Sequence, residues 1–149
     1  QPEPDFMGSY GDLGAILGEV DFLVICCPLT DATWGLIGRV ELAAMKDSAV
    51  VINVARGHIA DEDDLFGALS KGVIGGAVLD TWYQYPSPDN LAIRPSRHPY
   101  HDLDNVLMTP HISGWSEGQQ LRRWAKTGDN IEALMTGRDP INLIRPAQP

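Results

Sequence analysis

Four short apolar runs, separated by polar or helix-like stretches, constrain the fold most strongly. They are "DFLVICC" (21–27), "SAVVINVA" (48–55), "VIGGAVLD" (73–80) and "NVLMTPH" (105–111). Each has the length of a strand, and a continuous apolar run is typical of a strand that is buried on both faces. Strands that alternate with helices predict an α/β fold with a parallel sheet and right-handed crossovers.

The stretches between the runs carry helix signals. Residues 9–20 have apolar side chains at helical spacing, and a short helix is expected around 39–46. Asp61 is expected to cap a helix in "DEDDLFGALSKG", with Gly72 at its end. Residues 81–104 contain four prolines and predict a long irregular loop. A long helix is expected from Ser116, with an apolar side made of Leu121, Trp124, Ile131, Leu134 and Met135.

Composition excludes several classes of protein. The 149 residues suit one domain, or a piece of one, and 20 acidic against 11 basic residues give a net charge of −9. Because no Lys/Arg-rich patch is present, nucleic acid and anionic membranes are not expected as partners. No apolar run approaches the roughly 20 residues of a membrane span, and the N-terminus lacks signal-peptide features, so a cytoplasmic location is predicted. Cys26 and Cys27 lie inside the first run and are predicted to be reduced core thiols.

Chemically useful residues follow three of the runs. In an open parallel sheet, ligands bind beyond the carboxyl ends of the strands. Arg56 and Gly57 follow the second run, Asp80 ends the third and His111 ends the fourth. A guanidinium offers a planar fork of donors to a carboxylate or phosphate, and an imidazole exchanges a proton near neutral pH. Together these residues predict a site that binds a small anion and protonates it.

Each of these residues also has a purely structural interpretation. An Arg after a strand often forms a surface ion pair, a His in a turn is often a hydrogen-bonded structural residue, and Asp80 would suit a turn cap. Their common position at one predicted edge favours a site. His98 and His101 have H-x-x-H spacing, but no further ligands are suitably spaced, so no metal site is expected. Tryptophans are usually core or interface residues, although Trp82 and Trp115 are placed to line a pocket.

Three longer motifs carry a resemblance to a known family. In order and spacing, "INVARGHIADEDDLFGAL", "GVIGGAVLD" and "NVLMTPHISG" resemble the D-isomer-specific 2-hydroxyacid dehydrogenases. That family includes formate, phosphite and phosphoglycerate dehydrogenases and the C-terminal-binding-protein corepressors. The resemblance spans essentially the whole chain. It implies that residues 1–115 form the C-terminal half of a Rossmann-type sheet with covering helices, and that residues 116–149 form a crossover helix and a tail belonging to the substrate domain.

The resemblance also implies roles for individual residues. The catalytic Arg of the family falls on Arg56 and its proton-donating His on His111. The Asp of the family that lies by the nicotinamide amide falls on Asp80. Contacts with NAD, with NADP not excluded, fall on Cys27, Pro28, Thr33, Val54, Ala55, Arg56, Asp80, His111, Ser113 and Gly114.

The activity implied is that of an NAD(P)-dependent oxidoreductase. Arg56 would bind the carboxylate of a small anionic 2-oxo acid and polarise its carbonyl, and His111 would protonate the oxygen as the D-2-hydroxyacid forms. The full-length protein is expected to be a homodimer with neither a nucleic-acid nor a membrane partner. The alternative is an NAD-binding regulatory protein of the corepressor type with little turnover.

The chain departs from the family in its cofactor loop. The motif G-x-G-x-x-G is absent, and so is the acidic residue that holds the ribose in NAD-binding proteins. The glycines of "GSYGDLG" have the wrong spacing and follow no strand. In the family these elements precede the matched region. The 149 residues are therefore expected to be a C-terminal fragment that alone is inactive and binds NAD weakly.

A second departure lies beside the predicted catalytic histidine. Many members read D-x-x-x-x-E-P, and their Glu accepts a hydrogen bond from the histidine and raises its pKa. Here Asp80 and Pro86 are in register, but Tyr85 stands at the position of the Glu, next to Gln84. Tyr85 is therefore predicted as the third catalytic residue, with Gln84 or another group as the alternative for orienting His111. A neutral partner orients an imidazole but stabilises an imidazolium less than a carboxylate does.

Overall fold

The computed structural model describes residues 3–143. Its residue contacts divide the chain into two compact units, with the boundary between Ser113 and Gly114. The first unit contains the sheet, and the second contains one long helix and the tail. Each unit is described by itself below.

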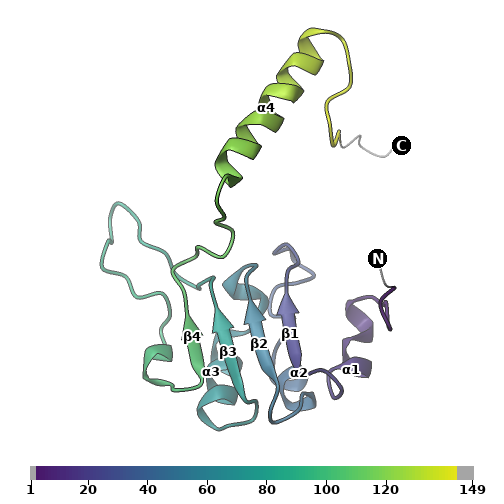
Figure 1. Cartoon of the computed structure of the whole chain (residues 1–149). Coiled ribbons are helices and arrows are strands. Elements are labelled where there is room, and N and C mark those ends of the chain that lie inside the picture. The colour runs from purple at the N-terminus through teal and green to yellow at the C-terminus, as the bar shows by residue number, and fades with distance from the viewer. Residues whose placement is uncertain (1–2, 144–149) are drawn as a thin grey trace. The chain divides into compact units, whose positions relative to one another are not determined.

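The first unit is built on four parallel strands, which confirms the predicted α/β class. They are β1 (Phe22–Ile25), β2 (Val50–Asn53), β3 (Gly76–Leu79) and β4 (Val106–Met108), and they pair in the order β1-β2-β3-β4 (Figure 1). Each strand is shorter than its apolar run, because the residues at both ends of the run leave the ladder for turns. Gly76 allows close approach at the start of β3, since a Cβ there would lie 2.7 Å from the carbonyl oxygen of Asn105.

The helices of the first unit are short; two precede β1, and the others lie between the strands in sequence. Their bounds are Tyr10–Asp12 (3₁₀) and α1 (Leu13–Ile16), α2 (Arg39–Ala44), Gly57–Ile59 (3₁₀), α3 (Glu62–Ser70) and Tyr100–Asp102 (3₁₀). Asp61 caps α3 as predicted, and its carboxylate accepts the backbone N–H groups of Asp63 and Asp64. Gly72 lies one residue beyond the observed C-cap, Lys71, and has a φ of +66° that suits glycine.

The two faces of the sheet differ in burial. One face packs with α2 and α3 into a core that includes Ile25, Val51, Leu65 and Leu79. On the other face the two outer strands, β1 and β4, carry side chains that remain open to solvent, namely Phe22 (64% exposed), Val24 (52%) and Leu107 (60%). The prediction that the first run is buried on both faces is therefore wrong for β1. An apolar run alone does not distinguish one covered face from two.

Both cysteines are free, and the prediction that they are core thiols is wrong for Cys26, which is exposed. The strand ends at Ile25, and Cys26 continues the exposed alternation of Phe22 and Val24 into the following loop. Cys27 is half-buried and packs against the core. It lies just beyond the carboxyl end of β1, and its contact with the cofactor stays a prediction.

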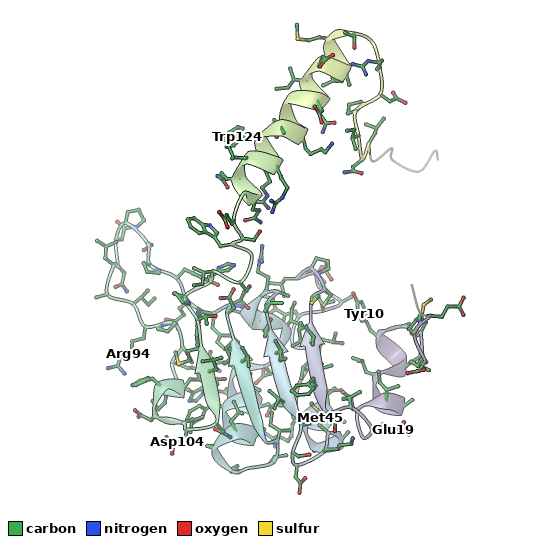
Figure 2. The ribbon with its side chains drawn as sticks, viewed as in Figure 1. Tyr10, Glu19, Met45, Arg94, Asp104 and Trp124 are labelled. Atoms are coloured by element: carbon green, nitrogen blue, oxygen red, sulfur yellow. The ribbon has the colours of Figure 1, made fainter. Side chains whose placement is uncertain are left out.

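The second unit consists mainly of α4 (Gln119–Met135), the long helix that the sequence predicts. Ala133 is buried, whereas the predicted apolar side is exposed at Leu121, Trp124, Ile131, Leu134 and Met135. Figure 2 shows Trp124 projecting outward from the helix. No helix among residues 3–143 is both long enough and apolar enough to cross a bilayer. The tail returns toward α4, and the backbone N–H of Ile141 donates to the Asn130 side chain at 2.8 Å.

Candidate active site

The carboxyl ends of β2, β3 and β4 meet at one edge of the sheet. The backbone N–H of Asp80 donates to the carbonyl of Asn53 at 3.1 Å, and that of Thr109 donates to the carbonyl of Leu79 at 2.9 Å. Gly57 brings the turn after β2 directly against the turn after β3. A Cβ at Gly57 would lie 2.6 Å from the backbone carbonyl of Trp82, so only glycine fits there without a shift of the chain.

Asn53 holds the turn that carries Arg56. Its side chain is almost fully buried, its Nδ2 donates to the carbonyl of Arg56 at 2.9 Å, and its Oδ1 accepts the N–H of Ala55 at 3.1 Å. The same oxygen accepts a hydrogen bond from the hydroxyl of Thr81, across from β3, at 3.3 Å. The Arg56 side chain is exposed beyond this turn, with Nη1 donating to the carbonyl of Ala55. Its guanidinium remains available to an anionic ligand.

Asp80 holds the turn that carries His111. Its carboxylate is 1% exposed and accepts the hydroxyls of Thr109 and Ser113, together with the N–H groups of Ile112 (2.9 Å) and Ser113 (3.0 Å). Burial alone raises the pKa of this carboxyl. The hydrogen bonds from Ser113, Thr109 and Ile112 outweigh burial and lower the pKa to about 2. Asp80 is therefore an anion at neutral pH.

His111 adopts a backbone conformation that is unusual for a residue with a side chain. Its φ is +59°, in the left-handed region, and the four hydrogen bonds to Asp80 hold the adjoining turn. The imidazole is exposed, and its centroid lies 5.5 Å from that of the Tyr85 ring, at a tilt of 47°. Tyr85 contacts His111 through its ring, because its hydroxyl accepts the backbone N–H of Trp82 at 2.9 Å. Gln84, the alternative candidate for orienting His111, donates its backbone N–H to the carbonyl of Pro95 at 3.0 Å.

A cavity of about 400 Å³ lies beside His111. Its walls are mainly apolar and aromatic, and they are formed by Trp82, Gln84, Tyr85, Pro86, Ile93, Pro95, Met108, Thr109, Pro110 and His111. Trp82 is held in place by its indole N–H, which donates to the carbonyl of Thr109 at 3.0 Å. The sequence prediction that Trp82 lines a pocket is confirmed, and Trp115, 86% exposed, lies in the second unit.

The loop after β1 contains the predicted contacts at Cys27, Pro28 and Thr33. Thr33 is buried, its hydroxyl donates to the carbonyl of Pro28 at 2.7 Å, and it accepts the N–H of Thr30 at 2.8 Å. Thr33 therefore closes this loop at the same edge of the sheet as Arg56. Val54 and Ala55 precede Arg56 in its turn, whereas Gly114 falls in the second unit.

Sequence reasoning missed three polar residues that shape the site: Asn53, Thr81 and Thr109. Asn53 does leave a signal, because it is a polar residue that interrupts the apolar run "VVINVA". His98 pairs with Asp63 and His101 lies 3.5 Å from Asp102, so the H-x-x-H spacing does not bring the two together on a ligand. Within residues 3–143, no group of three His, Cys, Asp or Glu side chains is arranged to hold a metal ion.

Comparison with known proteins decides the family. Residues 2–113 match the profile described as "D-isomer specific 2-hydroxyacid dehydrogenase, NAD binding domain". The chain belongs to the D-isomer specific 2-hydroxyacid dehydrogenase family. The predicted family and the predicted NAD-binding α/β fold are thereby confirmed.

Named relatives within this family are reductases and dehydrogenases. Glyoxylate/hydroxypyruvate reductase B of Pectobacterium carotovorum subsp. carotovorum (strain PC1) is 40% identical over 146 residues, which cover 98% of this chain and 43% of that protein. Among solved structures, an NADPH-dependent glyoxylate/hydroxypyruvate reductase of Sinorhizobium meliloti in complex with NADP and sulfate matches with a TM-score of 0.74, at 30% identity, covering 90% and 41% of the two chains. D-Lactate dehydrogenase of Lactobacillus jensenii with NAD⁺ matches with a TM-score of 0.76, at 26% identity, covering 89% and 42%. The chain thus spans less than half the length of these relatives.

The strand ends of this dehydrogenase-family domain suit an anionic dinucleotide. Arg56 and His111 are exposed there. The carboxylate at the end of β3, Asp80, is buried and bound by the His111 turn, so it presents no exposed negative charge to a phosphate. These strand ends therefore fit the anionic dinucleotide of an NAD-binding domain. The contact between Asp80 and the nicotinamide amide stays a prediction.

Proposed function

We propose that the protein is an NAD(P)-dependent oxidoreductase that interconverts small 2-oxo acids and D-2-hydroxyacids. Residues 1–115 would supply the C-terminal half of its dinucleotide-binding domain, together with the acid–base histidine. Residues 116–149 would supply the crossover to a substrate domain, since the matched relatives are more than twice as long as this chain. The named relatives favour glyoxylate and hydroxypyruvate as the first substrates to test.

The proposal rests on two turns at one edge of the sheet, each of which is held by a buried polar side chain. Asn53 holds the Arg56 turn and Asp80 holds the His111 turn, and backbone hydrogen bonds between β2, β3 and β4 join the two supports. A guanidinium after β2 and an imidazole after β4, placed by buried polar residues on either side of β3, suit a reaction that binds a carboxylate and moves one proton.

In this reaction each residue has one task. Arg56 binds the substrate carboxylate and draws electron density from the adjacent carbonyl. His111 gives its proton to the carbonyl oxygen and takes it back in the reverse direction. Tyr85 orients the imidazole through its ring, and Trp82 and Met108 line the cavity beside it. The bound nicotinamide supplies the hydride.

The test is reduction of glyoxylate and hydroxypyruvate by the natural protein at its full length, with NADH and NADPH compared. Pyruvate and phenylpyruvate extend the panel, and chiral chromatography of the products checks the D configuration. We expect Arg56→Ala mainly to raise KM for the oxo acid, and His111→Ala to lower kcat by roughly 10²- to 10⁴-fold.

Matched controls are available within the chain. Arg94 is an exposed arginine that points away from the sheet in Figure 2, and His101 is an exposed histidine outside the cavity beside His111. Arg94→Ala and His101→Ala should leave turnover unchanged. A His111→Ala variant with wild-type turnover would contradict the proposal. Dinucleotide binding without reduction of any acid would support the regulatory alternative instead.

A further inference from the structure

We infer that Glu62, in the first turn of α3, is a positioning residue for His111. It acts through the loop that carries Tyr85. The inference rests on the proposed function, because it assigns Glu62 to the same acid–base site. The residues that join α3 to this loop are Glu62, Asp63, Ser96, Arg97 and His98, and they are called the α3 clamp below.

Glu62 is the buried half of the α3 clamp. Its side chain is 12% exposed. Its Oε1 accepts the hydroxyl of Ser96 at 2.6 Å and the backbone N–H of Arg97 at 2.9 Å, and the guanidinium of Arg97 lies 3.3 Å from its other oxygen. Charge-assisted hydrogen bonds of this kind are about twice as strong as neutral ones. One carboxylate therefore fixes two consecutive residues at the far end of the loop.

Asp63 is the exposed half of the α3 clamp. It binds Arg97 Nη2 at 2.6 Å and His98 Nε2 at 2.6 Å. The hydrogen bond to His98 holds the pKa of the Asp63 carboxyl below its usual value, with Arg97 contributing in the same direction. His98 also stacks on Phe66 of α3, with ring centroids 4.5 Å apart and ring planes 9° from parallel. Because Asp63 is exposed, its ion pairs stabilise the clamp less than the bonds to Glu62 do.

Pro95 connects the α3 clamp to the neighbourhood of Tyr85. Its carbonyl accepts the backbone N–H groups of both Tyr83 (3.2 Å) and Gln84 (3.0 Å), and it directly precedes Ser96. Residues 83–84 are thus tied to the residue next to the clamp. The Tyr85 hydroxyl closes the same turn by accepting the N–H of Trp82. Movement at Ser96 therefore reaches the backbone next to Tyr85 through one peptide unit and two hydrogen bonds.

Tyr85 is the last step, because its ring lies against the His111 imidazole. Asp80 holds the backbone of the same turn by accepting the N–H groups of Ile112 and Ser113. Displacing the Tyr85 ring should therefore loosen the orientation of the imidazole while the backbone of the turn stays held.

The experiment compares Glu62→Ala with Asp64→Ala in the natural protein at its full length. Asp64 is a matched control, because it lies in the same helical turn but pairs with Arg39 instead of the loop. We expect Glu62→Ala to lower kcat for the oxo acid roughly 3- to 30-fold while KM for the dinucleotide changes less than about twofold. Asp64→Ala should change neither constant. Glu62→Gln should restore part of the activity, because its amide oxygen accepts the same two hydrogen bonds.

A double-mutant cycle with Tyr85→Ala tests the route of the effect. If Glu62 acts through Tyr85, Glu62→Ala causes little further loss in a Tyr85→Ala background. Additive losses, or equal losses from Glu62→Ala and Asp64→Ala, would overturn the inference.

A second readout does not need turnover. The Tyr85 ring lies 5.5 Å from the His111 imidazole and should shift its NMR signals by its ring current. The imidazole signals should therefore move in Glu62→Ala and in Tyr85→Ala and stay unchanged in Asp64→Ala. If the wild type reduces no 2-oxo acid, the proposed function fails, and this measurement still decides whether Glu62 positions His111. Unchanged imidazole signals in Glu62→Ala would contradict the inference.

Discussion

The turns that carry Arg56 and His111 are held in the same way by chemically different residues. Asn53 donates to the backbone carbonyl of Arg56 and accepts the backbone N–H of Ala55, so one uncharged amide is both a donor and an acceptor for the Arg56 turn. Asp80 only accepts, and it collects two hydroxyls and two N–H groups from residues 109–113. The Arg56 turn is thus closed by a group that never changes charge, whereas the His111 turn depends on a buried anion.

This difference indicates where the site is sensitive. Removing Asp80 leaves four donors without their charged acceptor, and a backbone in the left-handed region without its support. Removing Asn53 leaves two donors, the N–H of Ala55 and the hydroxyl of Thr81, and one acceptor, the Arg56 carbonyl, without this partner, in a turn whose Arg56 has an ordinary extended conformation. The acid–base residue is therefore predicted to depend more strongly on its buried support than the anion-binding residue does.

The largest effect is expected from Asp80→Ala. We expect the free energy of unfolding to fall by about 2–4 kcal/mol, because several donors lose a charged acceptor together. kcat should fall as His111 loses its fixed backbone. Urea denaturation followed by tryptophan fluorescence measures the first effect, and steady-state kinetics measures the second. A variant with wild-type stability and kcat would show that the His111 turn keeps its conformation without Asp80.

Much of this arrangement can be predicted from the sequence. Four apolar runs separated by helix signals lead to a parallel sheet, and the strand-edge rule then places Arg56, Asp80 and His111 near one another. The family resemblance then implies that Arg56 binds the anion and that His111 donates the proton. These inferences need only the order of the elements and the side-chain types, both of which a single sequence contains.

Other features depend on contacts that a single sequence does not specify. The positive φ of His111 arises from four hydrogen bonds to Asp80, a residue 31 positions earlier in the chain. The open face at Phe22 and Val24 depends on which elements pack against β1. The sequence places Tyr85 where a hydrogen-bonding partner of His111 is expected. In the structure the Tyr85 hydroxyl accepts the backbone N–H of Trp82, and the Tyr85 ring contacts the imidazole. Which partner a polar side chain binds depends on tertiary contacts, and local sequence patterns do not determine it.

A smaller effect is expected from Asn53→Ala. The carbonyl of Arg56 and the N–H of Ala55 lose their partners, and we expect the free energy of unfolding to fall by about 1–3 kcal/mol. KM for the oxo acid should rise more than kcat falls, because the change loosens Arg56 rather than His111. If Asn53→Ala lowered kcat and left KM unchanged, the predicted difference between the Arg56 turn and the His111 turn would be contradicted.

The most local effect is expected when the pH is lowered. Because the folded-state pKa of Asp80 is about 2, below its ordinary value of 3.8, the unfolded chain binds its proton first as the pH falls. The stabilisation from Asp80 is therefore complete well above pH 4 and is lost progressively as the pH approaches 2. Asn53 has no proton to gain over this range. Amide hydrogen exchange should show protection falling at Ile112 and Ser113 before it falls at Ala55, and Asp80→Asn should remove most of that difference. Parallel loss at both turns in the wild type would mean that global unfolding, and not protonation of Asp80, sets the acid limit of the site.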